Sequence, residues 1–175
     1  MVVRSHTVRR LCAGLLLVLT GWGSAGLAQA GEVVVSFQEP LRYADIGFGA
    51  VTRERNLKTL QDHMAAWGAR LPAAQRLEIE VLDVDLAGIE QPVGREPFVR
   101  VLNGKVDSPR ATLRWTLRQG ASVLASGRDE LGDLGYAHRL ALGDRLQPLY
   151  YDRRMLDEWL QSRVVERSAA GAAAR

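Results

Sequence analysis

The stretch Leu77–Gly88, LEIEVLDVDLAG, constrains the fold of this chain more than any other part of the sequence. It combines a run of β-branched and other apolar residues with four acids, Glu78, Glu80, Asp83 and Asp85. This composition favours a strand with one face toward a core and the other toward solvent. We expect Arg76–Leu86 to form the central strand of a sheet against which the rest of the chain packs.

The apolar residues of this strand change phase part-way along it. They occupy odd positions in Leu77–Val81 and even positions in Leu82–Leu86. A regular strand would turn Asp83 and Asp85 toward the core, at a cost of several kcal/mol for each unpaired carboxylate. One extra residue near Val81-Leu82, a β-bulge, would turn the apolar side chains to one face and the acids to the other. We predict this bulge, and an open polar face on which the acids pair with arginines.

The other elements are predicted from the periodicity of their apolar residues and from the capping, glycine and proline residues at their ends. Amphipathic helices are expected over Arg53–Leu71, with Thr52 as the N-cap, and from Pro148 to about Val165. Ala87–Pro97 is expected to be a loop, because it carries two glycines and two prolines. The further strands are expected at Glu32–Gln38, Phe98–Leu102, Arg110–Arg118 and Val123–Leu131.

The strand Arg110–Arg118 alternates without exception, with apolar residues on one face and arginine or threonine on the other. Its arginines are spaced like the acids of the central strand and are expected to lie opposite them. Three elements each carry a tryptophan on the apolar face, so Trp67, Trp115 and Trp159 are predicted to converge on one core. The order β-α-β-β-β-β-α predicts an α+β, two-layer sandwich, with two helices on one face of a mainly antiparallel sheet.

The first thirty residues have the pattern of a cleaved signal peptide. Three arginines precede the apolar segment Leu11–Thr20, and Ala28-Gln29-Ala30 has the A-x-A form of a cleavage site. The segment is shorter than the roughly 20 residues of a membrane-spanning helix, so no stable membrane anchor is expected after cleavage. We therefore expect a periplasmic or secreted protein cleaved after Ala30, with one domain over residues 31–167 and a flexible low-complexity tail over 168–175.

Removal of the leader changes the charge of the chain. The whole sequence has 23 Lys and Arg against 20 Asp and Glu, and the leader holds three arginines and no acid. The remaining domain is therefore formally neutral and lacks an overall field that would attract nucleic acid, which is not expected as a partner. The one cysteine, Cys12, lies in the leader, so the mature domain has no disulfide, thiolate metal site or cysteine nucleophile.

Five segments of the chain form a combination that is found in a known family. They are PLRYADIG (Pro40–Gly47), Leu77–Gly88, FVRVL (Phe98–Leu102), SPRATLRWTLRQG (Ser108–Gly120) and RRMLDEWL (Arg153–Leu160). Together they resemble one bacterial exported family, catalogued as domain of unknown function 3016. The resemblance covers nearly all of the mature chain, and its most specific pieces are the D-x-D-L-A-G segment and the strand that a Pro-Arg pair precedes. It implies a leader peptide and a stand-alone domain, and it implies no activity.

Asp83 and Asp85 are the strongest candidates for residues of a metal-binding or catalytic site. Two carboxylates at i and i+2 share a strand face, and with Glu78, Glu80 or Glu90 they could hold Ca²⁺ or Mg²⁺, or act as an acid–base pair. The alternative is that they face solvent or pair with the row of arginines.

Three arginines nearby in sequence, Arg95, Arg100 and Arg110, could form an anion site or serve as counter-charges. The two mature histidines, His63 and His138, are expected at polar surface or boundary positions. The sequence contains no G-x-S-x-G, H-E-x-x-H or P-loop motif, so we assign no catalytic residue, metal ligand or cofactor.

These observations favour a non-enzymatic periplasmic domain that binds an envelope protein or a small ligand, or that assists envelope maintenance. The second hypothesis is a small hydrolase or divalent-metal-dependent enzyme centred on Asp83 and Asp85. An enzyme needs a concave pocket in which these carboxylates converge with His138 or an arginine, whereas a binding module can leave them on an open sheet.

Overall fold

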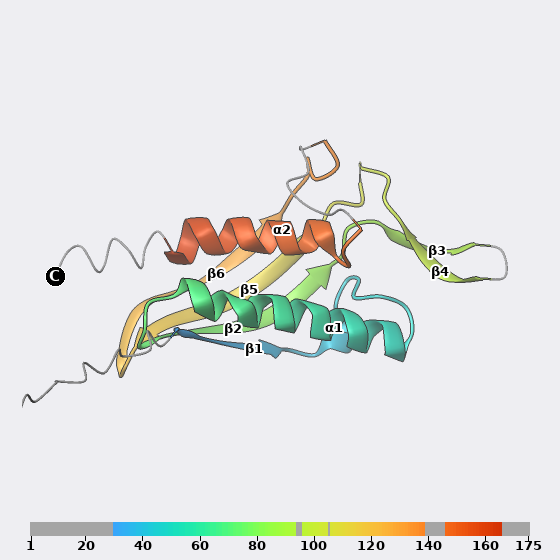
Figure 1. Cartoon of the computed structure of the whole chain (residues 1–175). Coiled ribbons are helices and arrows are strands. Elements are labelled where there is room, and N and C mark those ends of the chain that lie inside the picture. Colours follow the sequence, from blue (N-terminus) through green and yellow to red (C-terminus); the bar gives the residue numbers. More distant parts are fainter. Residues whose placement is uncertain (1–29, 94–95, 105, 139–145, 166–175) are drawn as a thin grey trace, which may run out of the picture.

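The computed structural model describes residues 30–93, 96–104, 106–138 and 146–165. The expected leader, apart from Ala30, and the expected tail lie outside the described residues. The chain has an α+β fold of two layers, with helices packed on one face of a sheet (Figure 1).

The described residues form strands and helices in the following order along the chain. The strands are β1 (Glu32–Phe37), β2 (Gln75–Asp85), β3 (Ile89–Val93), β4 (Glu96–Val101), β5 (Arg110–Gln119) and β6 (Ser122–Gly132). The α-helices are α1 (Ala50–Ala65), between β1 and β2, and α2 (Tyr150–Trp159), after β6. Shorter helical segments are η1 (Pro40–Arg42) and η2 (Ala66–Arg70), which flank α1, and η3 (Leu160–Val165), which continues α2.

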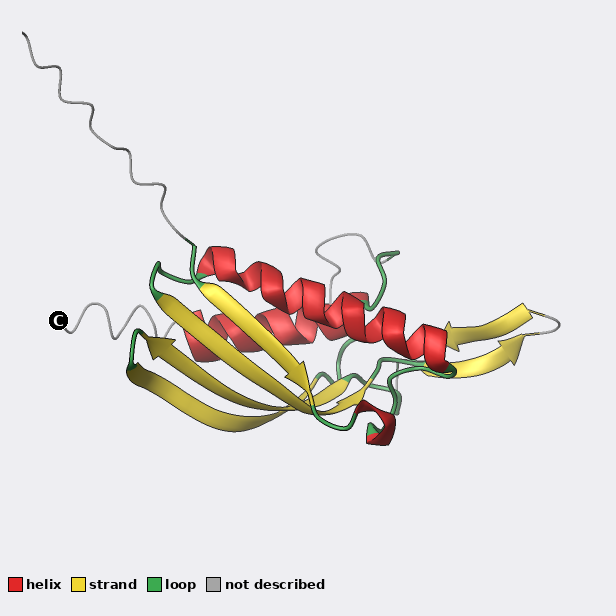
Figure 2. Cartoon of the chain, turned by 90° about the horizontal axis from the view of Figure 1, so that it is seen from below, coloured by secondary structure: helices red, strands yellow, loops and turns green. Residues whose placement is uncertain are grey.

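The main sheet has the strand order β1-β2-β5-β6. β1 and β2 are parallel, because α1 carries the chain back between them, and the other neighbours are antiparallel. β3 and β4 form a separate two-stranded ribbon that projects beyond the end of the main sheet (Figure 1). Both helices lie on the same side of the main sheet, so its other face is open (Figure 2).

The predicted β-bulge is present in β2. Val81 pairs with Leu113 and Asp83 pairs with Thr112, so Leu82 is the extra residue. The apolar residues of β2 on both sides of the bulge are buried, whereas the four acids are only half-buried. The bulge therefore resolves the phase change of the sequence as predicted, except that Leu82 itself is half-buried.

Acid–arginine pairs of the predicted kind lie on the open face of the sheet at the two glutamates of β2, Glu78 and Glu80. Arg114 of β5 pairs with Glu80 directly opposite it on β2, and Arg118 Nε lies 3.3 Å from Glu78 Oε2. Arg76 bridges Glu78 and Glu32 of β1. These pairs are largely exposed, so each contributes about 0–1 kcal/mol.

The three predicted tryptophans meet in the core between the sheet and the helices. The ring centroid of Trp159 lies 6.0 Å from that of Trp67 and 6.1 Å from that of Trp115, and all three side chains are buried. Asp129 of β6 accepts a hydrogen bond from the indole nitrogens of Trp115 and Trp159, both at 2.9 Å. The polar edge of each of these two indoles is thus satisfied inside the core.

Three expectations about element boundaries are wrong. Thr52 is not the N-cap of the first helix, which begins at Ala50, because Gly49 takes a φ of +81° that favours glycine at the cap position. Ala87–Pro97 is not a loop, because it contains β3, in which Pro92 is tolerated since a ribbon strand has a neighbour on one side only. The last helix begins at Tyr150 rather than Pro148, after Leu149 in the left-handed conformation.

Candidate functional site

Four of the five predicted binding residues lie where the main sheet meets the ribbon. Asp83 and Asp85 end β2, and Arg110 begins β5 directly opposite Asp85. Arg100 is on β4 and reaches back from the ribbon toward the same place. Arg95 lies outside the described residues.

The end of β2 holds the segment that follows η1. Ala44 N donates a hydrogen bond to Asp83 Oδ1 at 2.9 Å, and the backbone of Asp45 forms a parallel bridge at Asp85, through hydrogen bonds with Val84 O and Leu86 N. Burial, and after it the charge of Asp45, raises the pKa of Asp85 above its ordinary value. The side chain of Asp83 therefore has a structural role, because it helps to fix residues 44–45 on the bulged end of β2, whereas the bridge at Asp85 is made by the backbone.

Arg100 connects the ribbon to this segment through a bidentate ion pair. Its Nη1 and Nη2 donate to the two carboxylate oxygens of Asp45 at 2.9 and 3.2 Å, and Nη2 also donates to Glu90 Oε1 at 3.3 Å. Nη1 lies 2.9 Å from the carbonyl oxygen of Gly88 as well. Burial lowers the pKa of Arg100, but the hydrogen bond and charge of Asp45 outweigh it and raise the pKa. The guanidinium is thus occupied by protein acceptors and sets the direction of the ribbon.

Asp152, in the first turn of α2, lies behind the same junction and is buried. Its Oδ1 accepts a hydrogen bond from Ala87 N at 2.9 Å, which ties α2 to the chain between β2 and β3. Burial raises the pKa of Asp152 to about 6, although the backbone hydrogen bond and the charge of Arg100 lower it.

The surface in front of this network carries a cleft of about 380 Å³, which we call the loop cleft. Large apolar side chains line it although they are exposed, among them Leu41 (79%), Phe48 (66%) and Phe98 (46%). The rings of Phe48 and Phe98 contact each other, with their centroids 4.6 Å apart. The cleft is lined by Pro40, Leu41, Tyr43, Ala44, Asp45, Ile46, Gly47, Phe48, Arg53, Ile89, Glu90 and Phe98.

Hydrogen bonds hold the wall of the loop cleft in place. Phe48 N donates to Glu90 Oε2 at 2.7 Å, and the buried Asn56 of α1 donates from Nδ2 to the carbonyl oxygen of Ile46 at 3.0 Å. Gly47 has a φ of +104°, and a Cβ there would come within 2.8 Å of the Asn56 side chain. Phe48 therefore stands on a segment that is fixed to both the ribbon and α1.

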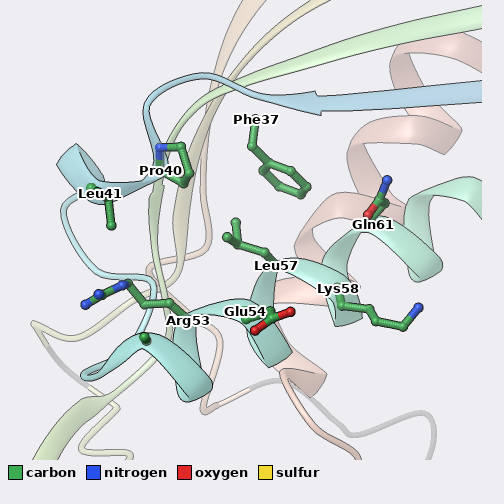
Figure 3. A pocket seen from close by; sticks show the side chains of 9 residues that line it. Phe37, Pro40, Leu41, Arg53, Glu54, Leu57, Lys58 and Gln61 are labelled. Atoms are coloured by element: carbon green, nitrogen blue, oxygen red, sulfur yellow. The ribbon is translucent and has the colours of Figure 1, made fainter.

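A second cleft of about 440 Å³, the helix cleft, lies between the end of β1 and the first half of α1 (Figure 3). Phe37 of β1 and Leu57 of α1 face each other across it, with Pro40 and Leu41 on one side. Its other lining residues are Ala50, Arg53, Glu54, Lys58 and Gln61. Pro40, Leu41 and Arg53 line both clefts, so the two form one continuous hollow surface.

Sequence reasoning did not single out these cleft residues. Leu41 and Phe48 lie between the first expected strand and the first expected helix, and Leu57 lies within that helix. The available signal was a pair of large apolar residues in a glycine-rich loop, since Leu41 follows Pro40 and Phe48 stands between two glycines.

The two histidines occupy the kinds of position expected for them. His138 is exposed, and His63 lies between the helices, where its Nδ1 accepts a hydrogen bond from Arg153 Nε at 3.1 Å. Its Nε2 lies 3.1 Å from Asp157 Oδ1, which also accepts from Trp67 Nε1 at 2.7 Å. Burial raises the pKa of Asp157, but the hydrogen bonds that it accepts, first from His63 and then from Trp67, together with the charge of Arg70 outweigh burial, and the net shift is downward. This group of side chains ties α1 to α2.

The described residues can also be considered for a metal site and for a membrane-spanning helix. Within residues 30–93, 96–104, 106–138 and 146–165, no three His, Cys, Asp or Glu side chains are grouped so that they could hold a metal ion. In the same ranges, no helix has both the length and the apolar character needed to cross a membrane.

Comparison with known proteins places the chain in a family. No curated protein and no solved structure matches the chain. One family model, described as "Protein of unknown function (DUF3016)", matches residues 31–162, which span both layers of the fold and both clefts. The chain therefore belongs to the DUF3016 family.

Proposed function

We propose that this protein is an exported, non-enzymatic domain that binds a partner protein of the cell envelope through the joined loop and helix clefts. The leader pattern, with its expected cleavage after Ala30, supports the export part of the proposal. The binding part rests on one observation, which is that large apolar side chains remain exposed around a hollow surface.

Exposed apolar residues scattered singly need no explanation, but a contiguous group around a hollow indicates a binding site. Leu41, Phe48, Ile89 and Phe98 line the same cleft, and each exposes about half or more of its surface. Polar groups such as Asp45, Glu90 and Arg53 border them, as in protein interfaces with an apolar centre and a polar rim.

The network behind the clefts supports binding to a preformed surface. Arg100, Asp45 and Glu90 fix the ribbon, and Asn56 fixes the loop, so the apolar residues are presented without a need for rearrangement. A preformed surface loses less conformational entropy on association than a mobile one.

The alternative hypothesis is an enzyme centred on Asp83 and Asp85, and the raised pKa of Asp85 is an observation in its favour. Against it, Asp83 already accepts a backbone hydrogen bond, and Asp85 lies opposite Arg110. Neither aspartate lines the loop cleft or the helix cleft.

Site-specific photo-crosslinking in the native host tests the proposal. p-Benzoyl-L-phenylalanine replaces Leu41 or Phe48 in the full chain, and irradiated adducts are identified by mass spectrometry. We expect the same partner protein at both positions. The matched controls are Val123 and Leu134, which are exposed apolar residues outside both clefts. Equal adducts at the control positions, or none at Leu41 and Phe48, would contradict the proposal.

A further inference from the structure

We propose that the bound part of the partner is an extended peptide segment, which adds as a strand to the open edge of β1. It places an apolar side chain in the helix cleft, against Phe37 and Leu57, and an acidic side chain at Arg53. This inference rests on the proposed function, and it specifies the form and the chemistry of the ligand.

The outer edge of β1 is suited to strand addition. β1 ends the main sheet, and within the described residues it pairs only with β2. Gln38 N, just after β1, donates to Val81 O of β2 at 2.9 Å. Successive N–H groups of a strand point to opposite sides, so those of Val35 and Phe37 point away from β2. An exposed edge of this kind is a template for another strand.

The two edges of the main sheet differ in how they are protected. β6 carries three successive charged residues, Arg128, Asp129 and Glu130, and the Asp129 carboxylate points inward to the tryptophan indoles. Its pairing with β5 also shifts register near one end. These are devices that discourage edge pairing. β1, EVVVSF, has a single charged residue, Glu32 at its start, and that residue is paired with Arg76.

The helix cleft continues from this edge and offers a place for a side chain. A strand added to β1 would direct alternate side chains toward the helix layer. Phe37 and Leu57 both line the cleft and are half-buried, so an apolar side chain that enters the cleft can pack against the exposed parts of both (Figure 3). Strand addition between a sheet edge and a helix combines main-chain hydrogen bonds for affinity with a pocket for specificity.

The positive charge of Arg53, where the two clefts adjoin, favours an acidic residue in the bound segment, next to its apolar residue. Arg53 lines both clefts, and its guanidinium makes no hydrogen bond or ion pair with any residue that the structure describes. Figure 3 shows its guanidinium on the side of Leu41, away from the Glu54 carboxylate. A peptide carboxylate at this place would form a charge-assisted pair with Arg53.

The direction of the added strand follows from its expected pairing. Antiparallel pairing is slightly more stable per residue than parallel pairing, so the segment should run opposite to β1. Arg53 lies beyond the C-terminal end of β1, on the side of Pro40 and Leu41. The acidic residue of the segment should therefore precede its apolar residue.

Selection from a random peptide library tests this chemistry, because it does not require the partner to be identified first. Random dodecapeptides displayed on phage are panned on the immobilised mature chain, and enriched peptides are measured by fluorescence anisotropy. We expect an enriched pattern of an Asp or Glu followed by a large apolar residue. Arg53→Glu should weaken the best peptide about five- to tenfold, and Lys in place of its acid should restore binding. Arg55→Glu, an exposed arginine of the same helix outside both clefts, is the control and should leave affinity unchanged.

N-methylation of the peptide backbone tests strand addition without altering the protein. Methyl groups on the alternate peptide nitrogens that face β1 should abolish binding, because they remove the hydrogen bonds to the strand edge. Methyl groups on the nitrogens that face away from β1 should leave the affinity unchanged. Equal tolerance in both phases, or no enriched peptides, would overturn the peptide-strand inference. Crosslinks at Leu41 and Phe48 would still support the proposed function in that case. A dimer of the mature chain in equilibrium centrifugation, with its β1 edges crosslinked to each other, would also overturn it and identify a second copy as the occupant.

Discussion

Replacement of Asp152 by asparagine should stabilise the protein at neutral pH. Burial raises the pKa of this carboxyl from 3.8 to about 6 in the folded protein. The difference is about two pKa units, and one unit corresponds to about 1.4 kcal/mol. The ionised carboxylate therefore lowers the free energy of unfolding by about 3 kcal/mol at pH 7. Asparagine is neutral and retains Oδ1, which can still accept the hydrogen bond of Ala87 N.

The dependence on pH separates this effect from an ordinary packing change. Between about pH 4 and pH 6, the folded protein holds a proton on Asp152 that the unfolded chain has released. The contribution of this group to stability is therefore largest below about pH 4, falls as the pH rises to about 6, and is constant above. Asp152→Asn should match the parent near pH 4 and exceed it by up to about 3 kcal/mol at pH 7.

Urea denaturation of the mature parent and variant, followed by tryptophan fluorescence from pH 4 to pH 7.5, measures the difference. Asp157→Asn, at the other end of α2, is a control of opposite sign. The pKa of Asp157 is lowered, so its contribution is present above the unfolded pKa and is lost as the pH falls. A stability difference between parent and Asp152→Asn that stays constant over this range would refute the buried carboxyl and its raised pKa.

The leader, the core and the bulge each give a further prediction. Mature protein from the native host should begin at Gly31, and periplasmic material with an intact Met1 in mass spectrometry would contradict cleavage. Trp115→Ala should lower the free energy of unfolding by about 3–5 kcal/mol, because the indole is buried against Trp159, and a loss below about 1 kcal/mol in urea titration would disprove that packing. Asn at both Asp83 and Asp85 should change stability by no more than about 1 kcal/mol each, since both lie on the open face; a larger loss would show that the carboxylates are enclosed.

The alternation of apolar and polar residues predicts which side chains of the central strands are buried. The strict alternation of Arg110–Arg118 predicted β5, and the phase change in Leu77–Leu86 predicted the bulge at Leu82. Such inferences succeed because burial of one face of an element imposes a period on the sequence. β3 was missed for the same reason, since a two-stranded ribbon buries no continuous face and its sequence IEQPV carries no clear alternation.

Which segments lie next to one another follows from the three-dimensional arrangement of the chain and not from its local patterning. The bidentate pair of Arg100 joins residues 55 positions apart, and the hydrogen bond of Asp152 joins residues 65 positions apart. The clefts arise where the end of β1, the loop before α1 and the ribbon meet. Their residues share no period, because a cleft is lined by side chains from separate segments. Its position depends on the pairing of strands and the direction of the ribbon, which local patterning does not encode.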